Sequence, residues 1–404
     1  MNNPSTLDHL TLAYAPLLGR WREMVGVRLK LLPSGHQARP DAEGLLRALG
    51  EAWDSHGSAP QEATASSGAT PLPVLLDATG STWAERLLEQ PLPGWVGLAM
   101  SATVAQDAAL AERLRAARSA GTWLVARAPS WEQVPESLRD CFGDLLVESE
   151  GGGVVGARLG RNTWVEGAHT LAEVNGFFEH GARGIVGWPR EAEPTAGRDI
   201  RAEVPVVVDL MNRVERQEPL ENLERALKTD PTLVFRLLRY INSAALGLRV
   251  EVTALRQALM LLGYLPLLRW LSRMLLDAAA KEAASRPLVH LSVRRGFLME
   301  SIGAVSGQSA EAPEMFLCGM FSLLDVLLQR PLGELVATLP LPERVRSSLL
   351  EPDGPYSLHL RWVEAVEGSS PSVIREALGA LRISPRTANL AVLQGLASAC
   401  TLDV

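Results

Sequence analysis

The chain has 404 residues, with 39 basic and 46 acidic side chains and a formal net charge of −7. That length suggests two or three domains, and a hydrophobic content of 47% supplies sizeable cores. The acidic balance argues against non-specific binding to nucleic acid or to an anionic membrane, because both need a basic surface. Residues 1–200 hold all the excess acid, with 17 basic against 24 acidic residues, which predicts two modules of different composition.

Cysteine usage and hydropathy exclude further classes of protein. The three cysteines lie far apart with no C-x-x-C pair, which excludes a disulfide framework or a cysteine-based metal cluster and favours a reducing compartment. The first ten residues have no basic segment followed by an apolar core, as a signal peptide would. The most apolar stretch, 257–268, is too short for a bilayer and predicts a buried helix pair. We therefore expect a soluble cytoplasmic protein without a membrane span.

The first half of the chain alternates strand and helix patterns after a polar segment. Residues 55–73 have almost no large apolar side chain and are predicted to form a mobile loop. Short apolar runs predict strands at 73–78, 95–100, 122–126, 144–148, 162–165 and 184–187. Amphipathic patterns predict helices at 82–89, 105–120, 132–141 and 171–180. This alternation predicts a parallel sheet of βα units, either open or closed into a barrel.

From about Pro205 the pattern is helical throughout. Asp230 is a favourable helix N-cap, and Pro231 is favourable at the first helical position. A later apolar helix ends at Gly263, and further helices are predicted at 265–280, 315–328, 342–350 and 385–399. The polar stretch 194–203 is predicted to link the two modules, an α/β domain over 1–193 and an all-α domain over 204–404.

Two patterns that suggest ligand sites lack the context those sites need. Gly151, Gly153 and Gly156 satisfy G-x-G-x-x-G, but a turn and a strand follow where a dinucleotide fold needs a helix, so we interpret them as a flexible hairpin loop. The seven histidines form neither an H-x-x-x-H motif nor an His-Asp pair. Because a metal site needs several convergent ligands, we interpret them as surface or packing residues.

Residues 220–270 resemble the opening of an HDOD domain, an all-helical relative of the HD hydrolases. The resemblance rests on the helix start at Asp230 and Pro231, on Asn242-Ser243 at a helix end, and on the apolar helix that Gly263 closes. It continues to the C-terminus and implies that these residues are structural.

HD hydrolases hold metal with histidines and an His-Asp dyad. At the dyad position this sequence reads Ser322-Leu323, and Leu291 occupies the place of the first histidine, with His290 beside it. A lone histidine cannot build such a metal site. The resemblance therefore implies a signalling or interaction module in the second half, and not a hydrolase.

Trp164–Trp188, WVEGAHTLAEVNGFFEHGARGIVGW, resembles the last repeats of an EAL domain. EAL domains are modified (β/α)₈ barrels that hydrolyse cyclic di-GMP with metal ions held by carboxylates. The resemblance places Glu166 on the first glutamate of the family motif, His169 on the second, and Val186 where a glutamine is usual.

The other catalytic positions of the EAL family depart further from its pattern. Arg28 falls on the signature glutamate, a charge reversal that would repel a metal cation, and Asp77 is nearest to the metal-binding asparagine. Strand residues 97–101 and 124–129 carry no carboxylate, and 144–149 carry no lysine. Asp77 and Glu166 remain as residual candidates, too few to hold two divalent ions. About 190 residues are also short for such a barrel, so a truncated or partly open one is expected.

These observations predict a bacterial signal-transduction scaffold without enzymatic activity, built from a degenerate EAL-like barrel followed by an HDOD domain. We expect no catalytic, cofactor or metal residues, no cofactor, and no nucleic acid among its partners. Unidentified protein partners are expected to bind through the HDOD domain. The alternative is a receptor that binds cyclic di-GMP, or another nucleotide, in the barrel without cleaving it. An active phosphodiesterase is disfavoured by Arg28 and by the strands that lack carboxylates.

Overall fold

The computed structural model forms two compact units, which we describe separately. The first contains Met1–Gly50, Pro71–Glu193 and Arg361–Val392, and the second contains Glu51–Thr70, Pro194–Leu360 and Leu393–Val404. The first unit thus takes in part of the C-terminal region that the sequence analysis grouped with the helical domain. The residues that the structure describes are 6–33, 41–55, 72–79, 82–103, 108–149, 159–160, 162–188, 203–227, 231–243, 246, 252, 254–279, 286–328, 330–337, 339, 341–368 and 370–400.

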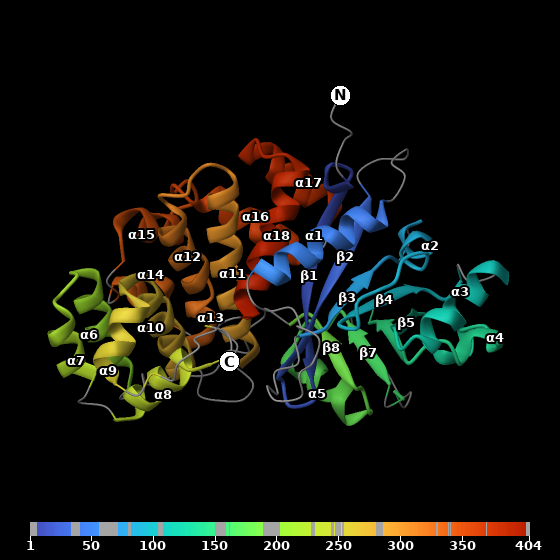
Figure 1. Cartoon of the computed structure of the whole chain (residues 1–404), viewed down its shortest axis with the longest axis horizontal. Coiled ribbons are helices and arrows are strands. Elements are labelled where there is room, and N and C mark those ends of the chain that lie inside the picture. The colour runs from blue at the N-terminus through green and yellow to red at the C-terminus, as the bar shows by residue number, and fades with distance from the viewer. Residues whose placement is uncertain are drawn as a thin grey trace. The chain divides into compact units, whose positions relative to one another are not determined.

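The first unit contains a closed barrel of eight strands (Figure 1). The strands are β1 (Leu10–Gly19), β2 (Met24–Pro33), β3 (Val74–Asp77), β4 (Val96–Ser101), β5 (Trp123–Arg127), β6 (Asp144–Glu148), β7 (Thr163–Glu166) and β8 (Gly184–Val186). β1 is antiparallel to both β2 and β8, and the other neighbours are parallel. The barrel closes because β1 pairs on both sides, so the expectation of a partly open barrel is wrong. The expected α/β barrel followed by helices is confirmed.

Helices of the first half of the chain connect the barrel strands. They are α1 (Ala42–Ser55), α2 (Trp83–Leu87), α3 (Ala108–Ser119), α4 (Glu136–Arg139) and α5 (Leu171–Glu179), with short 3₁₀ helices at Thr6–Asp8 and Trp131–Gln133. The Thr170 hydroxyl caps α5 by accepting a hydrogen bond from the Glu173 amide at 3.2 Å, as its position before an amphipathic run predicts. β1, β2 and α1 were not predicted from the sequence.

Alternation along the strands decides which side chains face the inside of the barrel. Leu75, Val125, Leu146 and Trp164 belong to one buried cluster in its interior. Because side chains two residues apart share a face of a strand, the residues two positions later also point inward. Those residues are Asp77, Arg127, Glu148 and Glu166. Each of the four lies at the carboxyl end of its strand.

The last helices of the chain belong largely to the barrel unit. They are α16 (Ser357–Gly368), α17 (Pro371–Leu381) and α18 (Pro385–Ala399). Asn389 of α18 is buried against β1, where its Oδ1 accepts from the Leu12 amide at 2.8 Å. Its Nδ2 donates to the carbonyls of Leu10 at 2.6 Å and Leu7 at 2.9 Å. One side chain thus binds two backbone groups of β1 and one of the 3₁₀ helix that precedes it.

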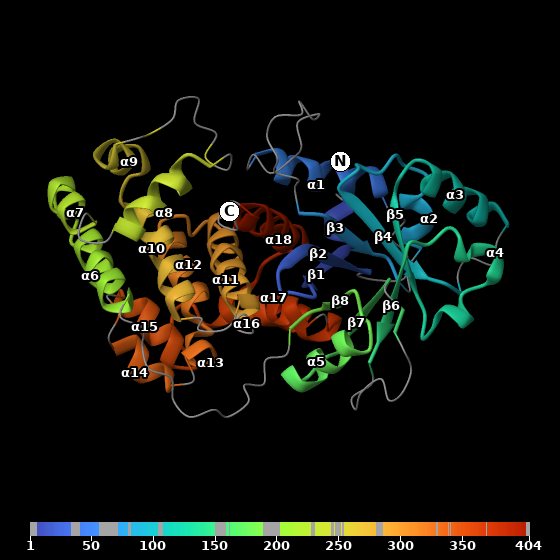
Figure 2. The same ribbon diagram turned by 90° about the horizontal axis from the view of Figure 1, so that it is seen from below.

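The second unit consists of helices (Figure 2). They are α6 (Glu203–Glu215), α7 (Leu220–Leu227), α8 (Pro231–Ile241), α9 (Leu255–Leu262), α10 (Tyr264–Ala279), α11 (Arg286–Val305), α12 (Ala312–Phe321), α13 (Leu324–Leu328), α14 (Leu332–Ala337) and α15 (Glu343–Leu350). The apolar helix pair predicted around 257–268 is α9 and α10, which meet at 108°, but it is not wholly buried as predicted, because Met260, Leu261 and Leu265 are exposed. Among the described helices, none by itself is long and apolar enough to cross a membrane.

Several predicted features lie outside the residues that the structure describes. These are nearly all of the loop 55–73, most of the linker 194–203 and the glycine motif at 151–156. The predictions made for these segments therefore stay predictions.

Candidate functional site

Five charged side chains from five strands meet inside the carboxyl-terminal mouth of the barrel. They are Arg28 of β2, Asp77 of β3, Arg127 of β5, Glu148 of β6 and Glu166 of β7. The carboxyl ends of the parallel strands meet at one end of a barrel, which brings together residues that are far apart in sequence. Together they carry two positive and three negative charges.

Two arginines hold this group together. Arg28 Nη1 lies 2.7 Å from Glu166 Oε1 and 3.4 Å from Asp77 Oδ2. Arg127 Nη1 lies 3.3 Å from the same Asp77 oxygen, and its Nη2 lies 2.9 Å from Glu166 Oε2 and 2.7 Å from Glu148 Oε2. Asp77 and Glu166 are therefore each shared between both guanidinium groups. We call these five residues the arginine–carboxylate cluster.

Burial makes these ion pairs strong and their disruption costly. The side chains of Arg28 and Asp77 are 2% and 0% exposed, Glu166 is 18% exposed, and Glu148 is open to solvent at 63%. Burial by itself would raise the pKa of Glu166, but the charges of Arg28 and Arg127 outweigh it and hold that pKa below its ordinary value. Burial would likewise lower the pKa of Arg127, yet Glu166, Glu148 and Asp77 raise it. The cluster thus favours the charged forms of Glu166 and Arg127.

The donor set of the cluster does not fit a pair of divalent cations. The oxygens of Asp77 already accept from Arg28, Arg127 and the Thr79 amide, the last at 3.0 Å. Within the described ranges, no group of three or more His, Cys, Asp or Glu side chains is arranged to hold a metal ion. A cation between Asp77 and Glu166 would meet two guanidinium groups that already neutralise these oxygens. The two residual candidates, Asp77 and Glu166, thus lie close together, and arginine side chains, not a metal ion, hold them there.

The remaining positions of the EAL pattern contribute no ligand to the cluster. Ser101, at the end of β4, exchanges a hydrogen bond with the Thr103 hydroxyl at 2.8 Å. The backbone amide of His169 donates to Glu173 Oε2 at 2.7 Å in front of α5. Val186 is 4% exposed and packs in the apolar interior of the barrel.

The residues of the HDOD resemblance have structural contacts where the structure describes them. Asp230 lies outside the described residues, and Pro231 begins α8. Asn242 Nδ2 donates to the carbonyls of Leu238 and Val252 at 2.9 and 2.8 Å, and its Oδ1 accepts from the Val252 amide at 2.7 Å. The Ser243 amide donates to the Tyr240 carbonyl at 3.1 Å. Gly263 follows α9 with a φ of 75°, a backbone angle that favours glycine.

In the helical unit a guanidinium group lies beside Ser322, which the HDOD resemblance places at the dyad position. Arg295 of α11 is 1% exposed, and its Nη1 donates to Ser322 Oγ at 3.1 Å. Ser322 Oγ in turn donates to the Gly319 carbonyl at 2.8 Å. Leu291, at the position of the first histidine, is buried. Ser322 is therefore bound to protein groups on both sides.

Arg127 and Glu148 are the members of the cluster that the sequence analysis missed. The EAL pattern calls for carboxylates in 124–129 and a lysine in 144–149, so an arginine and a glutamate there do not match it. The available signal was alternation, since Arg127 follows Val125 and Glu148 follows Leu146 at the inward-facing spacing of two. Arg28 was recognised as a charge reversal, but not as a partner of Asp77 and Glu166.

Comparisons with known proteins agree with the two-part fold. A family model for the HDOD domain matches residues 203–340. An uncharacterized Bacillus subtilis protein, YuxH, is 28% identical over 178 residues, which is 43% of each chain. The cyclic di-GMP phosphodiesterase CdgJ of Vibrio cholerae is 33% identical over 147 residues, 36% of this chain and 33% of CdgJ. A solved EAL domain protein from Listeria monocytogenes aligns with a TM-score of 0.29 and 10% identity, over 46% of this chain and 92% of its own.

This chain spans less than half the length of either curated relative in the matched regions. It carries an HDOD domain at residues 203–340, preceded by an EAL-like eight-stranded barrel. The expected combination of these two modules is confirmed.

Proposed function

We propose that this EAL-like and HDOD chain is a signalling protein without hydrolase activity, which acts by binding other proteins. The arginine–carboxylate cluster is the observation that carries the proposal. In this arrangement two guanidinium groups supply the positive charge that metal ions would supply in an active relative. A fold does not retain its chemistry once the groups that perform it have been replaced.

The cluster opposes metal-dependent hydrolysis in two ways. Arg28 and Arg127 repel a divalent cation, and they form ion pairs with Asp77 Oδ2 and with both carboxylate oxygens of Glu166. Hydrolysis of a phosphodiester by a metal-bound water needs several oxygen ligands around each ion. The cluster offers one buried carboxylate, Asp77, and one partly buried carboxylate, Glu166, and both already pair with arginines. The pairing of Arg295 with Ser322 supports the same conclusion for the HDOD domain.

Titration with Mn²⁺ tests this reading of the barrel. The full chain and a Glu166→Ala variant would be titrated, and free Mn²⁺ would be followed by electron paramagnetic resonance. We expect the two proteins to bind the same amount of Mn²⁺, because Glu166 already forms ion pairs with Arg28 and Arg127. A Mn²⁺ site present in the wild type and absent from the variant would contradict the proposal.

An exposed apolar corner of the HDOD domain supports a role in protein binding. Met260 and Leu261 at the end of α9 are 66% and 55% exposed, and Leu265 at the start of α10 is 38% exposed. Large apolar side chains grouped on a surface commonly mark contacts with other proteins. A Met260→Glu, Leu261→Glu variant of the full chain is expected to bind fewer of the proteins that the wild type captures from an extract of its native cells. Equal capture by both proteins would count against this surface.

A receptor for cyclic di-GMP is the second candidate function. It is supported by the matched phosphodiesterase and by Arg127, whose side chain remains 13% exposed at the mouth of the barrel, where a phosphate could approach it. Calorimetric titration of the full chain with cyclic di-GMP separates the two candidates. Binding that weakens in an Arg127→Gln variant would favour the receptor, and no binding would favour the protein-binding scaffold.

A further inference from the structure

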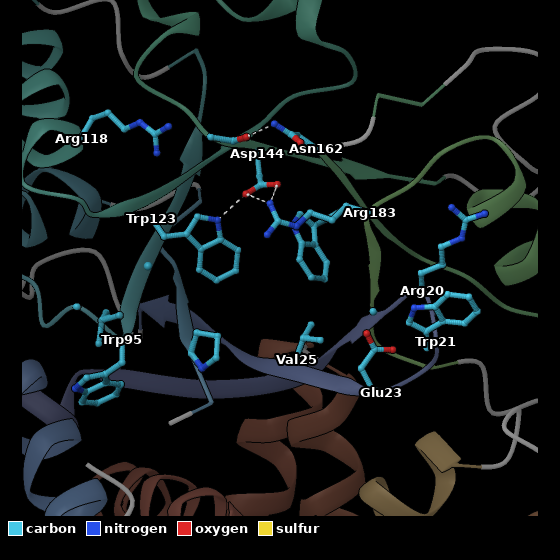
Figure 3. A pocket seen from close by; sticks show the side chains of 17 residues that line it. Arg20, Trp21, Glu23, Val25, Trp95, Arg118, Trp123, Asp144, Asn162 and Arg183 are labelled. Carbon is cyan, nitrogen blue, oxygen red and sulfur yellow. Dashed lines mark hydrogen bonds and ion pairs between the residues drawn. The ribbon is translucent and has the colours of Figure 1, made fainter. Parts of the chain in front are cut away.

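A second site lies at the opposite end of the barrel from the arginine–carboxylate cluster. It is a cavity of about 700 Å³ at the amino-terminal ends of the parallel strands (Figure 3). Trp123 and Asp144 begin β5 and β6, and Trp164 lies near the start of β7. A volume of 300–1,000 Å³ is typical of pockets that bind small molecules. In barrels of this type catalysis occurs at the other end, so this cavity has no role in hydrolysis.

The inner wall of the cavity is aromatic. The rings of Trp123 and Trp164 lie 6.2 Å apart, centroid to centroid, and are tilted by 57°. Two glycines make room for them: a Cβ at Gly97 would lie 2.6 Å from Trp123, and a Cβ at Gly184 would lie 2.3 Å from Trp164. Larger residues at these positions would displace the indoles. The two indoles are inclined to each other and Arg183 already lies over the ring of Trp164 at 5.8 Å, so the indole of Trp123 is the face left for a planar ring.

The charges around the cavity favour an anion. Its lining carries three guanidinium groups, from Arg20, Arg118 and Arg183, against the carboxylates of Glu23 and Asp144. Asp144 is already neutralised, because it accepts from Trp123 Nε1 at 2.7 Å and forms an ion pair with Arg183 Nη1 at 2.8 Å.

Figure 3 shows Arg118 and Arg20 on either side of the group formed by Trp123, Asp144 and Arg183. Arg20 and Arg118 are exposed and form no ion pair within the described part of the chain. These two guanidinium groups are therefore available to an anion that enters the cavity.

Two buried polar atoms of the lining have no hydrogen-bond partner among the described residues. They are Trp164 Nε1, on a side chain that is only 4% exposed, and Glu23 Oε2. An unsatisfied buried donor or acceptor is costly unless a ligand or water completes it. A heteroaromatic ring could offer an acceptor to the indole N–H and a donor to the carboxylate, which a plain hydrocarbon ring could not.

We propose that this cavity binds a planar heteroaromatic ring that carries an anionic group. The ring stacks on the indole of Trp123 beside the indole N–H of Trp164, and the anion lies at the rim, where Arg20 or Arg118 can pair with it. Nucleoside monophosphates and indole carboxylates belong to this chemical class. The site is remote from Arg28 and Asp77, so the inference does not rest on the proposed function.

Calorimetric titration of the full chain tests the proposal. The probes are the four ribonucleoside monophosphates and indole-3-acetate. Adenosine serves as the heteroaromatic ring without an anionic group, and ribose 5-phosphate serves as the anionic group without a heteroaromatic ring. We expect at least one of the anionic ring compounds to bind with a Kd below about 1 mM, and both adenosine and ribose 5-phosphate to bind at least about tenfold more weakly.

The rim is tested by charge reversal. An Arg20→Glu, Arg118→Glu variant should weaken binding of the anionic ring at least about tenfold. An Arg375→Glu, Arg386→Glu variant changes the net charge equally, at exposed positions of α17 and α18 that do not line the cavity, and should bind as the wild type does. A Trp21→Ala variant is a second test. It removes an indole at the rim that is 77% exposed, so the core stays intact, and it should weaken binding of the anionic ring.

Four results would overturn the proposal. They are binding of none of the anionic ring compounds, equal binding of adenosine, equal losses in both charge-reversal variants, and unchanged affinity in both the Arg20→Glu, Arg118→Glu and the Trp21→Ala variants. Thermal unfolding of each variant would establish that it is folded before the titration.

Discussion

Replacing Arg28 by methionine is the perturbation that most directly probes the arginine–carboxylate cluster. Methionine keeps most of the length of the side chain and removes its charge. Asp77, which is fully buried, then depends on Arg127 alone, and Glu166 loses its closer guanidinium partner. The variant therefore exposes the cost of leaving buried carboxylates with too little compensating charge.

The size of the effect follows from the two distances. At an effective dielectric constant of about 20, the attraction of Arg28 is about 6 kcal/mol for Glu166 at 2.7 Å and about 5 kcal/mol for Asp77 at 3.4 Å. Most of this attraction offsets the desolvation of the three groups. Removing one partner of such a buried group typically costs about 3–5 kcal/mol, and we expect Arg28→Met to lower the free energy of unfolding by that amount.

Urea unfolding followed by tryptophan fluorescence measures this effect. Eight of the ten tryptophans lie in residues 1–200, so the signal reports mainly on the barrel unit. Glu166→Gln and the double variant complete a cycle, in which a coupling of about 2 kcal/mol or more is expected for residues in one ion-pair network. Arg86→Met is the matched control, because Arg86 pairs with Glu89 on the surface. It should leave the urea midpoint unchanged.

Two outcomes would refute this reasoning. A loss below about 1 kcal/mol for Arg28→Met would mean that the guanidinium does not compensate buried charge. Additive effects of Arg28→Met and Glu166→Gln would mean that the two side chains are not partners in solution.

Three further predictions concern pH, the contact of Asn389 with β1, and the HDOD domain. The pKa of Glu166 in the folded chain is lower than its ordinary value of 4.5. The ionised Glu166 side chain therefore stabilises the fold above about pH 4.5, and this contribution is lost as the pH falls through the pKa of the folded state. Urea midpoints measured from about pH 6 to about pH 3 should thus fall less steeply for Glu166→Gln than for the wild type. Asn389→Ala removes the hydrogen bonds to the backbone of Leu7, Leu10 and Leu12 and should cost about 3 kcal/mol in urea unfolding, and a cost below about 1 kcal/mol would contradict this role. Gly263→Ala forces a φ of 75° on alanine and should cost about 1–3 kcal/mol, whereas an unchanged thermal midpoint would refute the strain.

The six strands β3 to β8 could be predicted from sequence because each is a short apolar run. The first two strands, β1 and β2, were missed, since they form a hairpin of ten-residue strands and not a βα unit. Closure of the barrel was also misjudged. The length of the first half suggested a partly open barrel, but the missed strand β1 closes the barrel by pairing with both β2 and β8.

The cluster could be predicted only in part. Arg28, Asp77 and Glu166 were found through the family pattern, but which of them pair depends on strand order and register. Arg127 is 50 residues from Asp77 in sequence and reaches it only in the closed barrel. The tie between Asn389 and Leu12 spans 377 residues, and no local pattern signals it. Pairing across such distances is a property of the folded chain and not of any one segment.

Hydrolysis of cyclic di-GMP is the measurement that tests the central claim most directly. The full chain would be incubated with cyclic di-GMP and either Mg²⁺ or Mn²⁺, and the products would be separated by chromatography. Because Arg28 and Arg127 neutralise the carboxylates that would hold the metal, we predict no product above a protein-free control. Turnover by the wild type that disappears in Glu166→Gln would contradict the account.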